Sequence, residues 1–211
     1  MTPAAQLAQG LLTLGVELAP TAEQRLLDYL ALLAKWNRTY RLTAVDQPSL
    51  AVSHHLLDSL VLLHFVEAPT LLDVGSGGGL PGIPLAIARP GLRVVLLEAN
   101  GKKAAFLRQA AIELDLANVA VHCGRVETYQ PGSAFALIVA RAFADLSTLV
   151  ALSRHLLAAD GHWLAMKGIR PQEEMARLPA GVRVDGIHRL RVPGIAGERH
   201  VVVMSTSQAQ H

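Results

Sequence analysis

The stretch that decides the fold reads Leu71-Leu72-Asp73-Val74-Gly75-Ser76-Gly77-Gly78-Gly79-Leu80-Pro81-Gly82. It runs from an apolar, strand-like segment into a glycine-rich loop, and a helix-like segment follows at residues 83–89. Glycines let the backbone approach a ligand closely because they carry no side chain. In doubly wound sheets, ligands bind outside the carboxyl ends of the strands, next to such loops. The stretch therefore predicts an α/β sheet with a ligand site at this loop.

The chain downstream of Pro69 alternates between short apolar runs and helix-like segments. Strand-like runs cover residues 70–74, 93–97, 119–122, 135–140 and 162–166, and helix-like segments cover residues 83–89, 102–115 and 146–158. This alternation indicates βαβ units and a doubly wound, mostly parallel sheet. Residues 183–191 and 199–206 are two further strand-like runs without a helix between them. They predict an antiparallel hairpin at one edge of a seven-stranded sheet.

The N-terminal part has a different pattern. Apolar residues recur at helical spacing over residues 26–36, a break follows at residues 37–48, and a second amphipathic segment spans roughly residues 49–66. We interpret residues 1–68 as a helical cap and residues 69–211 as the α/β core of one single domain. A chain of 211 residues is consistent with one domain.

Composition narrows the class of protein. The chain is 51% hydrophobic and 17% charged, with a formal net charge of +2. The apolar run at residues 56–66 is interrupted by Asp58 and His64 and is shorter than the ~20 residues of a membrane-spanning helix. No basic residue precedes Arg25, which argues against a signal peptide, and the single Cys123 cannot form an internal disulfide. We expect a cytoplasmic protein that binds no membrane.

The glycine-rich loop allows two interpretations. Gly77, Gly79 and Gly82 match the G-x-G-x-x-G pattern of dinucleotide sites, but the match starts late, because the strand ends nearer Gly75. The alternative is an acid, Asp73, followed by G-x-G-x-G. This pattern resembles the first motif of class I methyltransferases, whose loop faces the methionine part and the ribose of S-adenosylmethionine. An acid is favourable beside the ammonium group of that cofactor and unfavourable beside a pyrophosphate.

Glu98 ends the next strand-like run and is a second candidate cofactor residue. A carboxylate at this position can accept hydrogen bonds from both hydroxyls of a ribose. Because NAD-binding proteins use the same contact, Glu98 does not separate the two interpretations.

Further segments resemble one family, in the same order along the chain. They are Trp36-Asn37-Arg38-Thr39-Tyr40, Leu42-Thr43-Ala44-Val45, His55-Leu56-Leu57-Asp58-Ser59-Leu60, residues 73–84, Gly101-Lys102-Lys103, Phe106-Leu107-Arg108, Arg125-Val126-Glu127, Arg141-Ala142-Phe143-Ala144, Lys167-Gly168 and Gly197-Glu198-Arg199-His200. Together they resemble the bacterial small-subunit rRNA guanine-N7 methyltransferase family (RsmG, formerly GidB). The resemblance implies S-adenosylmethionine-dependent methylation of N7 of one guanine in 16S rRNA, either free or within the small ribosomal subunit. Two residues depart from the family pattern and bear on RNA contacts: Arg41 replaces an Asn, and His54 replaces a basic residue.

The chemistry that the resemblance implies needs alignment more than proton transfer. Guanine N7 carries an in-plane lone pair and no proton, so no general base is required, and positioning can supply roughly 7–11 kcal/mol of the barrier. Arg141 ends the fourth strand-like run and is the candidate positioning residue, with a buried ion pair to Asp73 or Asp145 as the alternative. The resemblance implies cofactor contacts at Gly75, Leu80, Val126, Glu127 and Arg141, and the glycine-rich loop and the next strand end add Asp73, Ser76, Gly77, Gly79 and Glu98 as candidate cofactor residues.

Basic residues supply a candidate RNA-binding surface. It consists of Lys102, Lys103, Arg108, Lys167, Arg199 and His200, which could contact phosphates. The nine histidines form no metal motif, so no metal is expected. We expect a monomer. Two alternative functions stay open, an NAD-dependent oxidoreductase and a methyltransferase-like RNA-binding module without catalysis.

Overall fold

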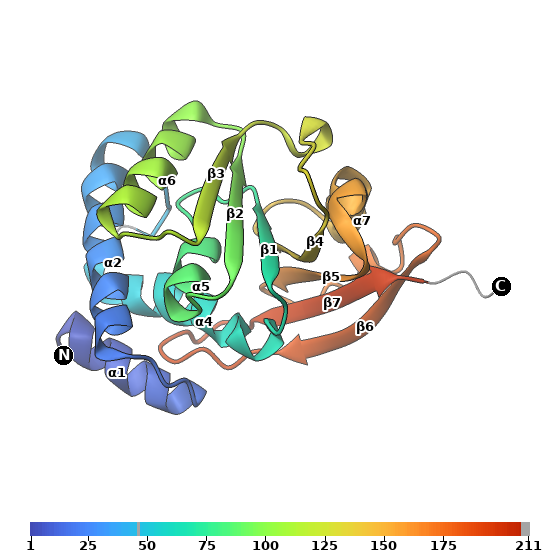
Figure 1. Ribbon diagram of the computed structural model, residues 1–211. Coiled ribbons are helices and arrows are strands. Elements are labelled where there is room, and N and C mark those ends of the chain that lie inside the picture. The colour runs from blue at the N-terminus through green and yellow to red at the C-terminus, as the bar shows by residue number, and fades with distance from the viewer. Residues whose placement is uncertain (46, 208–211) are drawn as a thin grey trace.

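A seven-stranded sheet forms the centre of the computed structural model, which describes residues 1–45 and 47–207 (Figure 1). The strands are β1 (Thr70–Val74), β2 (Arg93–Glu98), β3 (Val119–Cys123), β4 (Phe135–Arg141), β5 (Leu157–Lys167), β6 (Val182–Arg189) and β7 (His200–Thr206), in the order β3-β2-β1-β4-β5-β7-β6. Strands β1 to β5 are parallel, and β7 pairs antiparallel with both β5 and β6. The predicted doubly wound sheet with an antiparallel C-terminal hairpin is confirmed.

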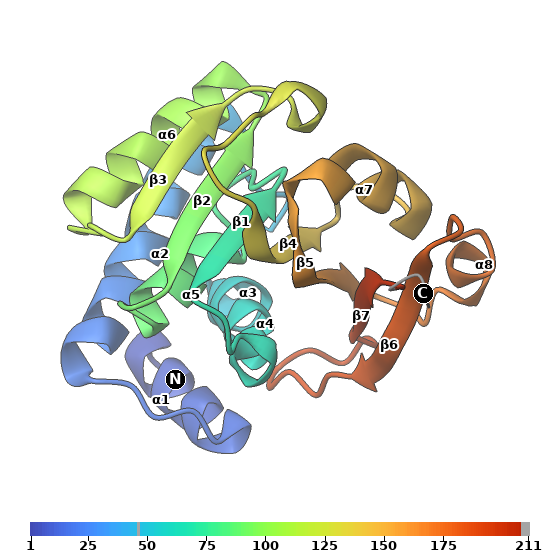
Figure 2. The same ribbon diagram turned by 45° about the vertical axis from the view of Figure 1, so that its right-hand side comes forward.

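Helices cover both faces of this sheet (Figure 2). Helices α5 (Gly82–Ala88) and α6 (Gly101–Glu113) lie on one face together with the N-terminal helices, and α7 (Leu146–Ser153) lies on the other. The cap and the sheet share one hydrophobic cluster, in which Leu26 and Leu60 are buried together with Leu96. A second cluster joins α7 to the opposite face of the sheet. The strand order reverses between β1 and β4, which is where ligands bind in such sheets.

The cap consists of α1 (Pro3–Leu14), α2 (Pro20–Tyr40), α3 (Pro48–Ala51), the π-helix η1 (Val52–Leu57), α4 (Asp58–Leu60) and the 3-10 helix η2 (Val61–Phe65). The predicted break at residues 37–48 begins too early, because α2 continues to Tyr40 and ends where Arg41 has a φ of 49°. The predicted segment at residues 49–66 is helical but is divided into α, π and 3-10 turns. The predicted boundary between residues 68 and 69 lies between η2 and β1.

The predicted helix at residues 146–158 is too long. Helix α7 ends at Ser153, one 3-10 turn η4 (Arg154–Leu156) follows, and β5 begins at Leu157, well before the predicted residue 162. Leu157 pairs with Phe135 of β4, so pairing with a neighbouring strand overrides the helix-like apolar pattern of this segment. The remaining short elements are η3 (Val126–Thr128) and α8 (Gln172–Met175).

Strand β6 lies at one edge of the sheet and carries an irregularity. Its pairing with β7 shifts register between Val184 and Gly186, as a β-bulge does. Within residues 1–45 and 47–207, no helix is long and apolar enough to cross a membrane.

Candidate functional site at the carboxyl edge of the sheet

Asp73 lies near the end of β1 and is fully buried. Its Oδ2 accepts a hydrogen bond from the backbone N–H of Gly82 at 2.9 Å, while Oδ1 is buried and has no hydrogen-bond partner among the described residues. Burial raises the pKa of this carboxyl to about 7, against the opposing effects of the Gly82 hydrogen bond and of the Arg141 charge. A cation beside Oδ1 would satisfy this atom and stabilise the ionised form.

Gly82, whose backbone N–H donates to Asp73, is the first residue of helix α5. A pyrophosphate in a dinucleotide site would need the positive end of this helix. Because a carboxylate already lies there, the geometry disfavours the G-x-G-x-x-G interpretation of Gly77, Gly79 and Gly82.

The loop after β1 has a backbone shape that requires glycine. Gly75, Gly77 and Gly79 have φ values of 68°, 57° and 89°, which L-residues with side chains rarely adopt. At Gly75 an added Cβ would also lie 2.6 Å from the Phe143 ring, so this ring sits directly against the loop. Ser76 is buried, and its hydroxyl donates to the Asp73 carbonyl at 2.8 Å, so its side chain stabilises the loop from within.

Glu98, at the end of β2, connects two loops. Its Oε2 accepts from the backbone N–H of Gly77 at 2.8 Å, and its Oε1 accepts from the backbone N–H of Asn100 at 2.8 Å. Each carboxylate oxygen has a second lone pair, so both can still accept from a ligand hydroxyl. The predicted acid therefore lies beside the glycine-rich loop, where a ribose contact is possible.

The other predicted cofactor residues differ in their exposure. Val126 is buried in the cluster beneath η3, whereas Glu127 is exposed next to it. Leu80 is buried in the core on the α5 face. The structure therefore places the Leu80 side chain in the core, where it supports the loop.

Helix α2 supports the glycine-rich loop from the cap side. The Tyr29 hydroxyl donates to the carbonyl oxygen of Gly78 at 2.6 Å, and both groups are buried. Burial raises the pKa of Tyr29 well above its ordinary value. Leu33 packs against the same glycine, 3.1 Å from the position that a Cβ would occupy. The cap thus contacts the glycine-rich loop at Gly78. This contact was not predicted from the sequence.

Arg141 ends β4 and makes an ion pair with an acid that the sequence analysis did not name. Its Nη1 donates to Asp58 Oδ2 at 3.1 Å and to the carbonyl oxygen of His54 at 3.0 Å. Asp58 is 4% exposed, and its second oxygen accepts from Nε of Arg199 at 3.1 Å. Asp73 or Asp145 was the partner considered only under the alternative interpretation of Arg141 as a buried ion pair, whereas the observed acid comes from the cap. A charged residue within an apolar helical run needs a buried partner, and this was the signal that could have identified Asp58.

The predicted basic residues fall into two groups. Lys102 and Arg108 are exposed on α6, and Lys103 is half-buried beside them. Lys167 is held internally, since its Nζ donates to Glu174 at 2.7 Å and to the Ala144 carbonyl at 2.8 Å. His200 is buried, with Nδ1 3.2 Å from the Gly168 carbonyl oxygen. Lys167, Arg199 and His200 form the second group, and the Arg199 side chain is the most exposed of the three.

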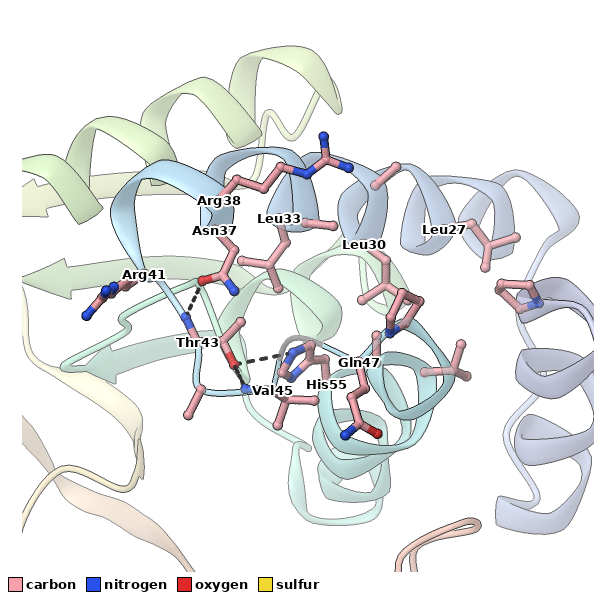
Figure 3. A pocket seen from close by; sticks show the side chains of 17 residues that line it. Leu27, Leu30, Leu33, Asn37, Arg38, Arg41, Thr43, Val45, Gln47 and His55 are labelled. Carbon is pink, nitrogen blue, oxygen red and sulfur yellow. Dashed lines mark hydrogen bonds between the residues drawn. The ribbon is translucent and has the colours of Figure 1, made fainter.

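A cavity of about 1000 Å³ lies in the cap between α2 and the segment leading to η1 (Figure 3). Its walls are mainly aliphatic, and its polar end carries Asn37, Thr43 and His55. Asn37 accepts from the Thr43 N–H at 2.9 Å, and the Thr43 hydroxyl lies 3.4 Å from His55 Nε2. Burial, and then the nearby charge of Arg141, lower the pKa of His55 to about 4, so this imidazole is neutral at physiological pH.

No group of three or more His, Cys, Asp or Glu side chains is arranged to hold a metal ion within the part of the chain that the structure describes.

Solved structures of low sequence identity share this fold. The O-methyltransferase TomG from Streptomyces achromogenes, solved in complex with SAM, has a TM-score of 0.58 at 19% identity and covers 85% of this chain and 90% of that chain. A SAM dependent methyltransferase from Aquifex aeolicus has a TM-score of 0.59 at 17% identity and covers 78% of this chain and 96% of that chain. The sheet order and the acid-glycine loop define a class I methyltransferase fold.

Sequence comparison identifies the family within this class. A family model described as rRNA small subunit methyltransferase G (GidB) matches residues 22–202. Ribosomal RNA small subunit methyltransferase G of Chromobacterium violaceum is 54% identical over 201 residues, which cover 95% of this chain and 96% of that protein. The chain belongs to the rRNA small subunit methyltransferase G family, and the predicted resemblance is confirmed.

Proposed function

We propose that this protein transfers the methyl group of S-adenosylmethionine to N7 of a guanine in 16S rRNA. The observation that carries the proposal is the membership of the rRNA small subunit methyltransferase G family, with a relative that matches 95% of the chain. The match includes both the cap and the α/β core, since the family model spans residues 22–202.

The geometry of the loop after β1 supports the cofactor assignment. Oδ1 of Asp73 is buried without a hydrogen-bond partner among the described residues, and we assign it to the ammonium group of S-adenosylmethionine; Glu98 is assigned to the ribose hydroxyls. Gly77 leaves room for close approach of a ligand, because an added Cβ there would meet nothing nearer than the Gly75 carbonyl oxygen at 3.8 Å. Val126 and Glu127 are proposed to flank the adenine. When bound, the sulfonium group supplies an electrophilic methyl group.

The chemistry at guanine N7 fits a site without a general base. The N7 lone pair attacks the methyl carbon as the bond from that carbon to sulfur breaks, and no proton is transferred. The residues therefore have to hold the base in line with the methyl group, which can supply roughly 7–11 kcal/mol of the barrier. Arg141 is the proposed positioning residue, because it ends β4 beside the loop and carries a fixed guanidinium group.

Contacts with RNA are proposed for the basic residues at this edge. Lys102, Lys103 and Arg108 on α6 and Arg199 before β7 retain exposed or half-exposed positions suited to phosphates. Lys167 and His200 already bind internal partners, so we assign them a supporting role in this surface. We further propose that the protein acts as a cytoplasmic monomer, which its mass in solution by light scattering would test.

Label transfer tests the proposal directly. The protein is incubated with methyl-tritiated S-adenosylmethionine and 16S rRNA from cells that lack this methylation, either naked or as assembled small subunits. We expect label at a single guanine, with the modification at N7 by nucleotide mapping. Label on another base, on a protein or on a small molecule would contradict the proposal. RNA binding without label transfer would instead support the non-catalytic RNA-binding alternative, and binding of NAD alone would support an oxidoreductase.

A further inference from the structure

Three elements far apart in the sequence bring one acid and two arginines together. Asp58 begins α4 in the cap, Arg141 ends β4, and Arg199 directly precedes β7. Arg141 Nη1 lies 3.1 Å from Asp58 Oδ2, and Arg199 Nε lies 3.1 Å from Asp58 Oδ1. Each carboxylate oxygen thus binds a different guanidinium group, so the single acid fixes the position of one arginine relative to the other.

The burial of the three side chains is unequal. The Asp58 side chain is 5% exposed, whereas those of Arg141 and Arg199 are 23% and 27% exposed. The acid is therefore enclosed, while both arginine side chains are partly exposed. One carboxylate between two guanidinium groups leaves a net charge of +1 at the surface of the cluster.

Both arginines retain hydrogen-bond donors. A guanidinium group has five N–H groups. Arg141 uses Nη1 for Asp58 and the His54 carbonyl, and Arg199 uses Nε for Asp58 and Nη1 for the Glu198 carbonyl. Nε and Nη2 of Arg141 and Nη2 of Arg199 have no hydrogen-bond partner among the described residues. Paired N–H groups of arginine are well suited to bidentate binding of phosphate oxygens.

We infer that Asp58 is a positioning residue that holds Arg141 and Arg199 as one binding site for a single phosphate group of the RNA substrate. The inference rests on the proposed function and deepens it, because it assigns the negatively charged Asp58 a role in binding a negatively charged substrate. The cluster lies at the carboxyl edge beside β4, so a phosphate held there places its nucleotide next to the glycine-rich loop.

A role of Asp58 in geometry and a role in charge alone predict opposite effects of removing this acid. Removing an acid raises the net charge of the protein and would by itself strengthen RNA binding. If Asp58 acts through geometry, its loss instead weakens productive binding, because the two guanidinium groups no longer share one orientation.

The experiment compares Asp58→Asn with the wild-type protein in label transfer onto 16S rRNA. We expect kcat/KM for the RNA to fall roughly 10- to 100-fold, mainly through a higher KM. The Kd for S-adenosylmethionine, measured by calorimetry, is expected to stay unchanged. The slope of log(1/KM) against log salt concentration should become shallower by about one phosphate contact. Unchanged or improved kcat/KM would overturn the inference.

The matched control is Asp185→Asn. Asp185 also pairs with an arginine, Arg183, at 2.6 Å, but it lies on β6 away from the cluster. This variant should retain wild-type kinetics, and an equal loss of kcat/KM in it would overturn the assignment to Asp58.

A second variant keeps the test valid if Asp58→Asn is unfolded at the assay temperature. Arg199→Lys retains the charge but loses the planar donor pair. The inference predicts a similar rise in KM for RNA, whereas wild-type kinetics in this variant would refute it. If the wild-type protein itself transfers no label, the proposed function fails, and this outcome is distinct from failure of the inference.

Discussion

Beside the ends of β1 and β2, carboxylates accept hydrogen bonds from backbone N–H groups. Beside the end of β4 and the start of β7, one carboxylate binds two guanidinium groups. Asp73 binds a backbone N–H group 9 positions away in the sequence, and Glu98 binds backbone N–H groups 21 and 2 positions away. Asp58 binds side chains that are 83 and 141 positions away in the sequence. The first region is shaped by local backbone and the second by long side chains from three elements. The difference teaches that loop shape determines the proposed cofactor site, whereas charge pairing determines the proposed substrate site.

The largest expected effect comes from breaking the charge-paired region. Asp58→Ala leaves two guanidinium groups beside each other without their acid. We expect the free energy of unfolding to fall by about 2–3 kcal/mol, below the ~3–5 kcal/mol of fully buried pairs, because both arginines are partly exposed. Urea unfolding followed by tryptophan fluorescence measures this change. Glu173→Ala is the control, because it breaks an exposed pair with Arg177 and should cost well under ~1 kcal/mol.

At the cofactor end, Glu98→Gln should weaken S-adenosylmethionine binding more than it weakens the fold. The amide retains one acceptor oxygen, so one of the two backbone contacts and the charge toward the ribose are lost. We expect the Kd to rise roughly 10- to 30-fold, as for the loss of about 1.5–2 kcal/mol from hydrogen bonds to a charged group. Calorimetry measures the Kd, and Glu113→Gln on the exposed face of α6 serves as control. An unchanged Kd would remove Glu98 from the site.

The pH dependence of cofactor binding tests the buried acid at the same end. Asp73 has a pKa raised to about 7 by burial, so it is mostly protonated below that pH and ionised above it. The ammonium group of the cofactor favours the ionised form, so its affinity should rise as pH increases from about 5.5 to 7.5, by up to roughly tenfold for a coupling of about 1.4 kcal/mol. Asp73→Asn should remove the dependence. A flat profile in the wild-type protein would show that Asp73 acts on the loop alone.

The smallest effect is expected where the cap meets the loop. Tyr29→Phe removes the hydroxyl that donates to Gly78 and leaves that carbonyl oxygen buried without its partner. We expect a loss of about 1 kcal/mol in the free energy of unfolding and a Kd for S-adenosylmethionine raised only a few-fold. Tyr40→Phe, at an exposed ring, is the control and should change neither quantity.

The sequence predicts the region at the ends of β1 and β2 better than the region around Asp58. The first depends on local backbone, whereas the second depends on side chains that lie far apart in the sequence. The strand at residues 70–74 and the loop after it follow from local apolar pattern and glycines, so Asp73 and Glu98 were correctly placed at strand ends. The partner of Arg141 was not predictable in this way, because nothing local relates it to Asp58. The helix at residues 146–158 was overextended, because only the pairing of Leu157 with Phe135 reveals where the strand begins. The roles of the site residues stay predictions until the variants are measured.

The bulge on β6 has a consequence for how the molecule behaves in solution. An open sheet presents unpaired backbone groups at its edge, which can recruit strands from other molecules. On β6 the register shift between Val184 and Gly186 distorts this edge, and the charged Arg183 and Asp185 lie beside it. Both features oppose edge-to-edge association. A sheet of seven strands can therefore remain open on this side without seeding aggregates, even in a chain that is 51% hydrophobic.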